Sequence, residues 1–128
     1  MIASAMLFGG AAILAGWGAA HILIPTRNII DGFGPLTVEN RRILLMEWLM
    51  EGVLLIFLGL LVALVRAFAP EDELTPLVVY RTSAAVLVVM AGISLATGAR
   101  SKIGPMRMCP LIFISAALLF WLPTVFRP

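Results

Sequence analysis

Four long apolar stretches divide this sequence, and they constrain its fold more than any other feature. Each approaches the ~20 residues that an α-helix needs to cross the hydrocarbon core of a bilayer. The stretches span residues 2–24, 43–65, 77–99 and 108–126. Continuous apolar runs without a two-residue alternation indicate helices and not the strands of a membrane barrel. We therefore predict four transmembrane helices.

The composition agrees with a lipid environment. Hydrophobic residues make up 62% of the 128 residues and charged residues 12%, whereas soluble domains average about 45–50% apolar and about 25% charged residues. The polar segments between the apolar stretches are short, so consecutive helices should be antiparallel neighbours. The predicted fold class is all-α: one transmembrane domain, residues 1–128, forming an integral membrane four-helix bundle with up-down-up-down topology.

Turn-forming and basic residues mark the loops. The segment 31–35 (DGFGP) has strong turn chemistry, and Thr37 or Asn40 could cap the second helix. Basic residues gather in the first and third loops: Arg27, Arg41, Arg42, Arg100, Lys102 and Arg107. By the positive-inside rule these two loops should be cytoplasmic. We therefore predict a multi-pass protein of the cell membrane with both termini outside.

The charges and the single cysteine exclude several classes of function. The net charge is +2, and the basic residues flank apolar stretches without forming the basic face that nucleic-acid binding requires. Cys109 is the only cysteine, so no intrachain disulfide is possible. The sequence has no Gly-rich phosphate loop, Cys-x-x-Cys pair or His-Glu-x-x-His motif. No nucleic-acid partner and no cofactor is indicated.

Small residues recur at four-residue spacing on two of the predicted helices. The first helix carries Ala12, Gly16 and Ala20, and the third carries Ser94 and Gly98. Such spacing lets helices approach closely in lipid, where packing drives their association. We expect these residues to pack the bundle. The alternative is an interface of a homodimer or of a larger membrane complex.

Two glutamates inside the second apolar stretch are the strongest indication of function. Glu47 and Glu51 are spaced i, i+4, which puts both on one helix face. An acidic group at such a depth costs ~2.5–3.5 kcal/mol on insertion scales, and these groups usually face a bundle interior or a wet cavity. Burial and mutual repulsion should keep at least one of them protonated near neutral pH. The structural alternative is pairing with Arg41, Arg42, Arg81 or a backbone donor.

The only histidine, His21, lies one turn before Pro25 at the end of the first helix. Because the first two helices are antiparallel, it should lie at the depth of Glu47. An imidazole beside a carboxylate can relay protons or act as acid and base. We predict Glu51, His21 and Glu47 as catalytic residues, with a packing role for the histidine as the alternative. The three could also bind a metal, but the pattern does not predict a metal site.

Five further residues are predicted to bind a ligand: Trp17, Trp48, Asn40, Arg41 and Arg81. The two tryptophans could line a pocket or belong to the interfacial aromatic belt. Asn40 and Arg41 lie at the predicted cytoplasmic mouth, where they could bind an anionic headgroup or anchor the helix. Arg81 could be a counter-ion for a substrate anion or for Glu51, or it could snorkel to the interface.

Two segments resemble the DoxX-like group of small four-helix membrane proteins. They are GAAHILIP at residues 18–25 and EGVLLIFLGL at residues 51–60. The resemblance covers roughly the first half of the chain, leaves out residues 40–42 and Glu47, and implies the four-helix membrane fold. A histidine with two acids in a membrane pocket is also similar to the constellation of sterol-isomerase-type (emopamil-binding) proteins.

These features predict a membrane-embedded site for a lipophilic small molecule, such as an isoprenoid, a quinone or a sterol-like compound. Glu51 and His21 would exchange protons with the molecule, and Glu47 would position the pair. One alternative is a small proton-coupled transporter with Glu51 as its proton and substrate site. Another is a non-catalytic membrane subunit or scaffold whose acids bond to a partner.

Overall fold

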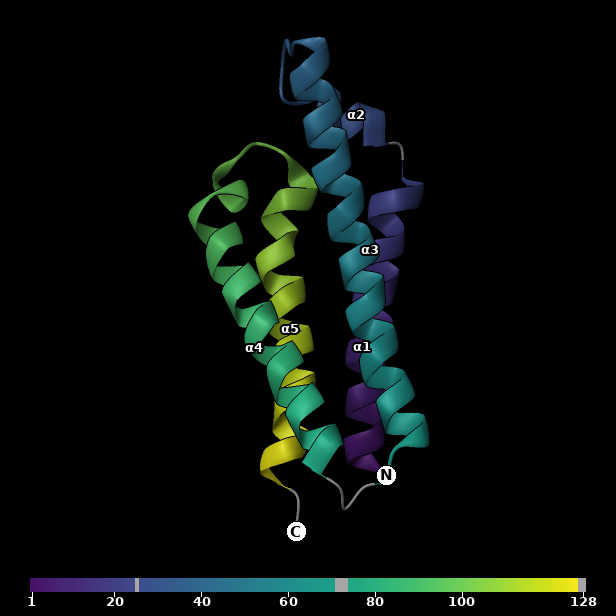
Figure 1. Ribbon diagram of the computed structural model, residues 1–128. Coiled ribbons are helices and arrows are strands. Elements are labelled where there is room, and N and C mark those ends of the chain that lie inside the picture. The colour runs from purple at the N-terminus through teal and green to yellow at the C-terminus, as the bar shows by residue number, and fades with distance from the viewer. Residues whose placement is uncertain (25, 71–73, 127–128) are drawn as a thin grey trace.

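The computed structural model describes residues 1–24, 26–70 and 74–126. Four long helices dominate it: α1 (Ile2–Leu23), α3 (Val38–Phe68), α4 (Leu74–Ala96) and α5 (Gly104–Val125). A short helix, α2 (Thr26–Asp31), follows α1, and a single 3₁₀ turn, η1 (Gly98–Arg100), follows α4. The long helices lie side by side and alternate in direction, so that both chain ends lie at one end of the bundle (Figure 1). The predicted all-α, up-down-up-down bundle is confirmed.

All four long helices have the length and hydropathy needed to cross a membrane. Large apolar side chains cover their outer surfaces, among them Phe57, Leu60 and Val89, each more than half exposed. Apolar surface of this extent suits lipid, which in turn requires the backbone hydrogen bonds that helices provide. The protein is therefore a small multi-pass membrane protein. Its placement in the cell membrane with both termini outside stays a prediction.

Helix α3 begins at Val38, ahead of the apolar stretch predicted from Ile43 but directly after Thr37, one of the two predicted caps. Thr37 caps it, since the backbone N–H of Asn40 donates to Thr37 Oγ1 at 3.1 Å. The polar residues after Thr37 therefore belong to the helix and not to a loop, because a membrane-spanning helix can extend beyond the bilayer into water. The 31 residues of α3 extend about 46 Å, well beyond the ~30 Å hydrocarbon core. Its first turns reach past the neighbouring helices (Figure 1).

The other boundaries differ from prediction by only a few residues, but α2 was not predicted. It lies in the segment that was expected to be the first loop. The strong turn chemistry of residues 31–35 led to a loop prediction for the whole segment, and the short helix before the turn was missed. Ile30 anchors α2 in the bundle with 2% of its surface exposed. At the start of α5, Pro105 occupies a first-turn position, where a helix does not use the missing N–H.

Glycines allow a close approach between α1 and α3. A Cβ added to Gly18 would lie 2.5 Å from the carbonyl oxygen of Gly52, and one added to Gly52 would lie 2.9 Å from that of Gly18. Both distances are inside van der Waals contact, so only glycine permits this approach. Large side chains from all four long helices fill much of the rest of the core, among them Leu14, Leu55, Leu87, Phe113 and Phe120.

The small-residue stripe predicted to pack the first helix faces outward, which corrects that expectation. Ala12 and Gly16 are exposed and Ala20 is half-buried, and a Cβ on Gly16 would meet nothing within 4 Å. The buried face of α1 instead contains Gly10, Ala11 and Gly18. In a helix this rich in alanine and glycine the four-residue spacing occurs on more than one face, so spacing alone does not identify the buried one. An interface with a second copy stays a prediction.

Candidate functional site

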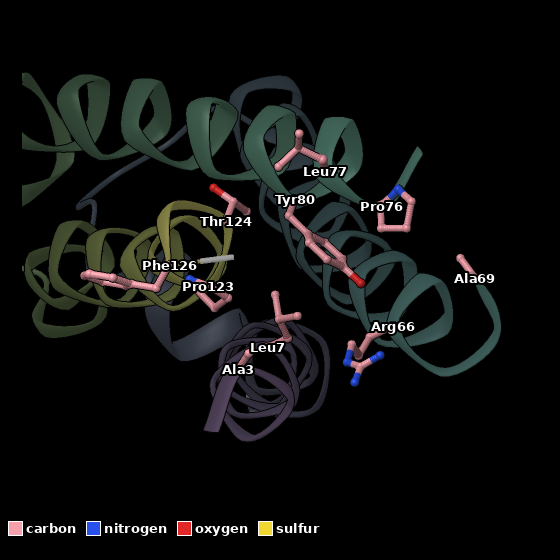
Figure 2. Close-up of a pocket in the computed structure, with 10 residues that line it drawn as sticks. All are labelled: Ala3, Leu7, Arg66, Ala69, Pro76, Leu77, Tyr80, Pro123, Thr124 and Phe126. Carbon is pink, nitrogen blue, oxygen red and sulfur yellow. The ribbon is translucent and has the colours of Figure 1, made fainter. Parts of the chain in front are cut away.

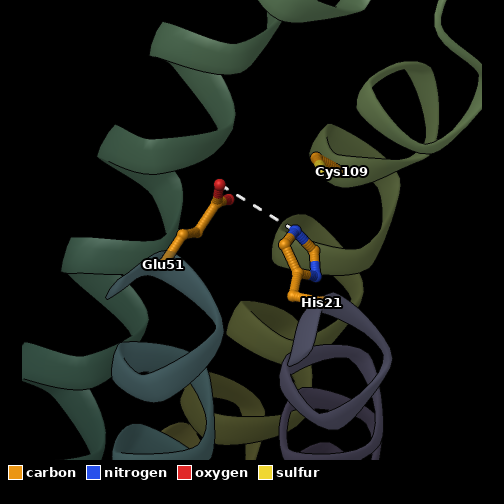
Figure 3. Close-up of side chains that lie close together, drawn as sticks. All are labelled: His21, Glu51 and Cys109. Atoms are coloured by element: carbon orange, nitrogen blue, oxygen red, sulfur yellow. Dashed lines mark ion pairs between the residues drawn. The ribbon is translucent and has the colours of Figure 1, made fainter. Parts of the chain in front are cut away.

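Three chemically reactive side chains from three helices meet in the half of the bundle nearer α2. They are His21 of α1, Glu51 of α3 and Cys109 of α5, and one ligand-type atom of each lies within 4.8 Å of the other two. His21 Nε2 lies 3.9 Å from Glu51 Oε2. The carboxylate and the imidazole point toward one another, with the thiol beyond them on α5 (Figure 3). His21 and Cys109 are buried, whereas the Glu51 side chain is 32% exposed.

The imidazole of His21 is held in one orientation. Its Nδ1 donates to the backbone oxygen of Trp17, one turn back, at 2.9 Å. A ring nitrogen that bonds to a carbonyl oxygen carries a hydrogen, so in the neutral imidazole Nε2 is the nitrogen with the lone pair. Trp48 stacks on the ring with 4.3 Å between centroids, and Trp17 meets it edge-on at 5.5 Å. These contacts present Nε2 to Glu51.

Trp48 also fixes the end of α1 against α3. Its Nε1 donates to the buried backbone oxygen of His21 at 2.9 Å. In a helix that oxygen would accept from the residue four positions on, which is Pro25, and proline has no N–H to donate. A carbonyl without a donor is costly in lipid. The tryptophan therefore supplies the hydrogen bond that the sequence removes.

Acceptor atoms dominate the chemistry of the cluster. An ionised carboxylate only accepts hydrogen bonds, and Nε2 of His21 accepts in the tautomer described above. The thiol of Cys109 donates to the backbone oxygen of Pro105 at 3.4 Å, so its sulfur also faces the cluster as an acceptor. Contact between Glu51 and His21 is then favourable when the two share a proton. The pair can thus hold a proton and release it to a third group.

Glu51 also lines two cavities between α3 and α4, which the first turns of α5 border as well. These helices touch only sparsely, since α3 packs mainly on α1 and α4 mainly on α5. The larger cavity, about 490 Å³, extends toward α2 past Glu47 and Ile30. The smaller, about 290 Å³, extends to Cys109 and Thr97. The walls are mostly apolar, and the side chains common to both cavities are Trp48, Glu51, Met90 and Met106.

Of the three predicted catalytic residues, the structure brings two together. His21 faces Glu51, but the carboxylate of Glu47 is not in the cluster of ligand atoms around them. Glu47 is exposed and lines the larger cavity one helical turn away. Trp48 takes the place against His21 that the antiparallel register had suggested for Glu47. The depth estimate was therefore close, but the helix is rotated so that the neighbouring residue meets the imidazole.

The predicted ligand-binding residues fall into three places. The two tryptophans flank the imidazole, as described above. Asn40 and Arg41 lie on the exposed first turns of α3. The backbone of Asn40 takes part in the helix cap, and the Arg41 guanidinium pairs with Asp31 of α2. These two residues therefore serve the structure of the projecting segment.

Arg81 lies at the opposite end of the bundle from the cluster. Its Nε donates to Thr124 Oγ1 at 3.1 Å, and the guanidinium lies over the Trp121 ring, 5.4 Å from the centroid. The arginine thus ties α4 to the end of α5. This placement rules out the suggested role as counter-ion of Glu51.

Cys109 is not among the predicted site residues, although it belongs to the cluster. It lies on the fourth spanning helix, which in the sequence looks like plain packing. One signal for it exists, because in an up-down bundle the start of the fourth helix lies beside the end of the first. Depth along the helices therefore places Cys109 near His21, while sequence spacing does not.

A third cavity, of about 150 Å³, lies at the end of the bundle that holds both termini. Arg66 of α3 donates from Nε and Nη2 to Ser4 Oγ of α1, at 3.2 and 2.7 Å. Tyr80 of α4 reaches into the same space (Figure 2). The contacts here hold helix ends together, far from His21 and Glu51.

No family model matches the chain, and no curated protein or solved structure gives a significant match to it. The class of protein is therefore defined by the fold and the candidate site alone. The chain is a small four-helix membrane protein in which a buried histidine faces a partly exposed glutamate at the wall of a cavity. Membership of the DoxX-like group stays a prediction.

Proposed function

We propose that this protein binds a lipophilic small molecule from the bilayer and exchanges a proton with its polar group through Glu51 and His21. One observation carries the proposal: a buried imidazole faces a carboxylate that is 32% exposed at the wall of a cavity. Intramembrane acids that face a cavity usually mark sites of function. A proton held by the pair is within reach of a molecule in that cavity.

The two residues have different tasks in this mechanism. Glu51 meets the bound molecule, because it alone of the pair lines the cavities. His21 lies behind it and takes up or returns the proton, with its tautomer fixed by the backbone oxygen of Trp17. The 3.9 Å between Nε2 and Oε2 would shorten once a ligand is bound, as is common for acid–base pairs.

The cavities suit a molecule that is apolar except at one end. Small-molecule sites are typically ~300–1,000 Å³ and largely apolar, with a few convergent polar groups. Methionine side chains, here Met90 and Met106, adapt easily to ligands of different shape. An isoprenoid, quinone or sterol-like compound with a hydroxyl or carbonyl group at one end fits this description. Glu47, which lines the larger cavity, would position that polar group.

Tryptophan fluorescence offers a direct test of the proposal. Trp17 and Trp48 flank the imidazole, so a quinone in the cavity should quench their emission. We expect saturable quenching of the detergent-purified protein by a short-chain quinone, and displacement by an isoprenoid alcohol or a sterol would rank the three chemical classes. Glu51→Gln and His21→Ala should each weaken binding at least tenfold.

Arg81→Gln is the matched control, because Arg81 lies at the other end of the bundle. This variant should bind the quinone as tightly as the unchanged protein does. The proposal fails if none of the three compound classes binds, or if Glu51→Gln and His21→Ala bind as well as the control.

A further inference from the structure

We infer that His21, Glu51 and Cys109 form a zinc site with one coordination position open to the cavity between α3 and α4. The three residues come from three different helices, and their ligand-type atoms converge to within 4.8 Å of one another. An imidazole, a carboxylate and a thiol are the side chains that zinc sites combine. The three potential metal ligands are far apart in the sequence, and only the folded bundle brings them together.

The geometry requires only a small contraction around the ion. Zinc bonds are about 2.0–2.3 Å long, which puts tetrahedral ligand atoms about 3.3–3.6 Å apart. His21 Nε2 and Glu51 Oε2 are already 3.9 Å apart. Rotation of the glutamate side chain and of the single χ angle of Cys109 would supply the remaining shift of about 1 Å, without any movement of the helices.

His21 already has the surroundings of a metal ligand. A ligating histidine usually donates its other ring N–H to a carbonyl or carboxylate, which fixes the tautomer and the ring orientation. Here Nδ1 donates to the Trp17 oxygen at 2.9 Å, and the Trp48 ring stacks on the imidazole. The nitrogen that carries the lone pair is therefore the one that faces Glu51 and Cys109.

Charge balance in the membrane favours a divalent ion at this place. One thiolate, one carboxylate and a neutral imidazole make a neutral complex with Zn²⁺, and a net charge in lipid would be expensive. As the Zn–S bond forms, the Cys109 proton leaves to water, and any proton shared by His21 and Glu51 leaves as well. Calcium and magnesium are disfavoured because both prefer all-oxygen ligands.

Three protein ligands leave the fourth position of a tetrahedral zinc for an exogenous group. Both Glu51 and Cys109 line the smaller cavity, together with Ser94 and Thr97. Water or the polar group of a bound molecule could therefore reach the ion from that side. Sites of this open kind are typical of zinc that exchanges a ligand, whereas purely structural zinc has four protein ligands.

The zinc inference does not rest on the proposed lipophilic ligand. Zinc and the shared proton are alternative occupants of the same acceptor atoms, so bound zinc should suppress proton exchange by the pair. The two ideas can fail separately. Quinone binding is measured in the presence of a chelator, and metal binding is measured without any quinone.

Cobalt is the probe that tests this site, because a Co²⁺–thiolate bond gives a charge-transfer band that oxygen and nitrogen ligands do not give. The full chain is purified in detergent, stripped with a chelator and titrated with Co²⁺. We expect one equivalent to bind with this band, and Zn²⁺ to displace it. Cys109→Ser should abolish the band, and His21→Gln should weaken binding at least tenfold.

Glu47→Gln is the matched control for Glu51→Gln, since both remove one carboxylate from α3 and only Glu51 is in the cluster. Glu51→Gln should weaken Co²⁺ binding at least tenfold, and Glu47→Gln should leave it unchanged. The inference is overturned by a protein that gives no charge-transfer band, by a band that persists in Cys109→Ser, or by equal effects of the two glutamate changes. If Cys109→Ser does not fold, the glutamate comparison decides.

Discussion

Alanine at Gly18 should separate α1 from α3, and alanine at Gly16 on the same helix should not. The added Cβ at Gly18 would lie 2.5 Å from the Gly52 oxygen and 3.0 Å from the Ile56 backbone nitrogen. Two backbone atoms obstruct it, so no side-chain rotation can relieve the contact. At Gly16 the same Cβ meets nothing within 4 Å.

The two changes have the same effect on helix propensity and differ in the steric term. Glycine to alanine inside a helix gains roughly 0.5–1 kcal/mol. Overpacking a well-packed contact costs about 1–3 kcal/mol. Because backbone atoms obstruct the added Cβ at Gly18, we expect the cost there to lie near the upper end of this range. Gly18→Ala should therefore unfold more easily than Gly16→Ala by about 2–3 kcal/mol, and Gly16→Ala should be as stable as the unchanged protein or slightly more so.

Reversible unfolding in mixed micelles of a mild detergent and SDS measures this difference. The same proteins are then titrated with Co²⁺, because separation of α1 and α3 must lengthen the 3.9 Å contact between His21 and Glu51. We expect at least tenfold weaker Co²⁺ binding for Gly18→Ala only. Equal unfolding midpoints for the two variants would refute the reasoning that the glycine contact sets the helix spacing.

Three further changes test other parts of the structure by the same unfolding assay. Trp48→Phe keeps the aromatic stack but removes the hydrogen bond to the His21 oxygen, which should cost about 1–3 kcal/mol; an unchanged midpoint would show that another donor serves that oxygen. Thr37→Ala removes the cap of α3 and should cost about 0.5–2 kcal/mol, with Thr82→Ala, exposed on α4, as the control. Arg81→Lys loses the Nε bond to Thr124 and should lower stability without altering Co²⁺ binding, so a change in Co²⁺ binding would place Arg81 in the site.

The four helices could be predicted because lipid leaves an apolar run of this length almost no other structure. His21 and Glu51 could be predicted for the converse reason, since polar groups at that depth are costly and seldom incidental. The antiparallel order of the first two helices put the histidine near the two glutamates, although it suggested the depth of Glu47 and the structure pairs His21 with Glu51. Each of these conclusions depends on length, depth and charge, which the sequence states directly.

The rotation of each helix about its axis was not predictable in the same way. The i, i+4 spacing puts Glu47 and Glu51 on one face, but it does not say which residue of that face meets α1. The contact between Gly18 and Gly52 fixes the rotation, and it places Trp48 against the histidine. The same limitation explains the outward small-residue stripe, because composition alone does not distinguish one face of a glycine-rich helix from another.

Cys109 was missed for a different reason, although depth along the helices would have placed it near His21. Its neighbours in the cluster lie on α1 and α3, and the contact depends on how the fourth helix closes the bundle. A single buried cysteine in an apolar helix looks in sequence like any small apolar residue. Only the assembled bundle brings its sulfur beside a histidine and a glutamate.

The short helix α2 has a consequence for how a ligand would be selected. Ile30 and Phe33 line the α2 end of the larger cavity beside Glu47, and because the walls are mostly apolar a lipophilic ligand would come sideways out of the lipid. The concentration that governs occupancy is then the concentration in the bilayer. A compound that partitions 10,000-fold into lipid gains the equivalent of about 5.6 kcal/mol before it makes any contact, at about 1.4 kcal/mol per tenfold.

Partitioning favours every lipophilic molecule in the membrane, including the lipids themselves, and so it cannot distinguish among them. Discrimination would have to come from the few polar atoms that the cavity presents. In the larger cavity those atoms belong to Glu51 and Glu47, which line it, and to His21 behind Glu51. The protein would therefore select a head group and tolerate many tails.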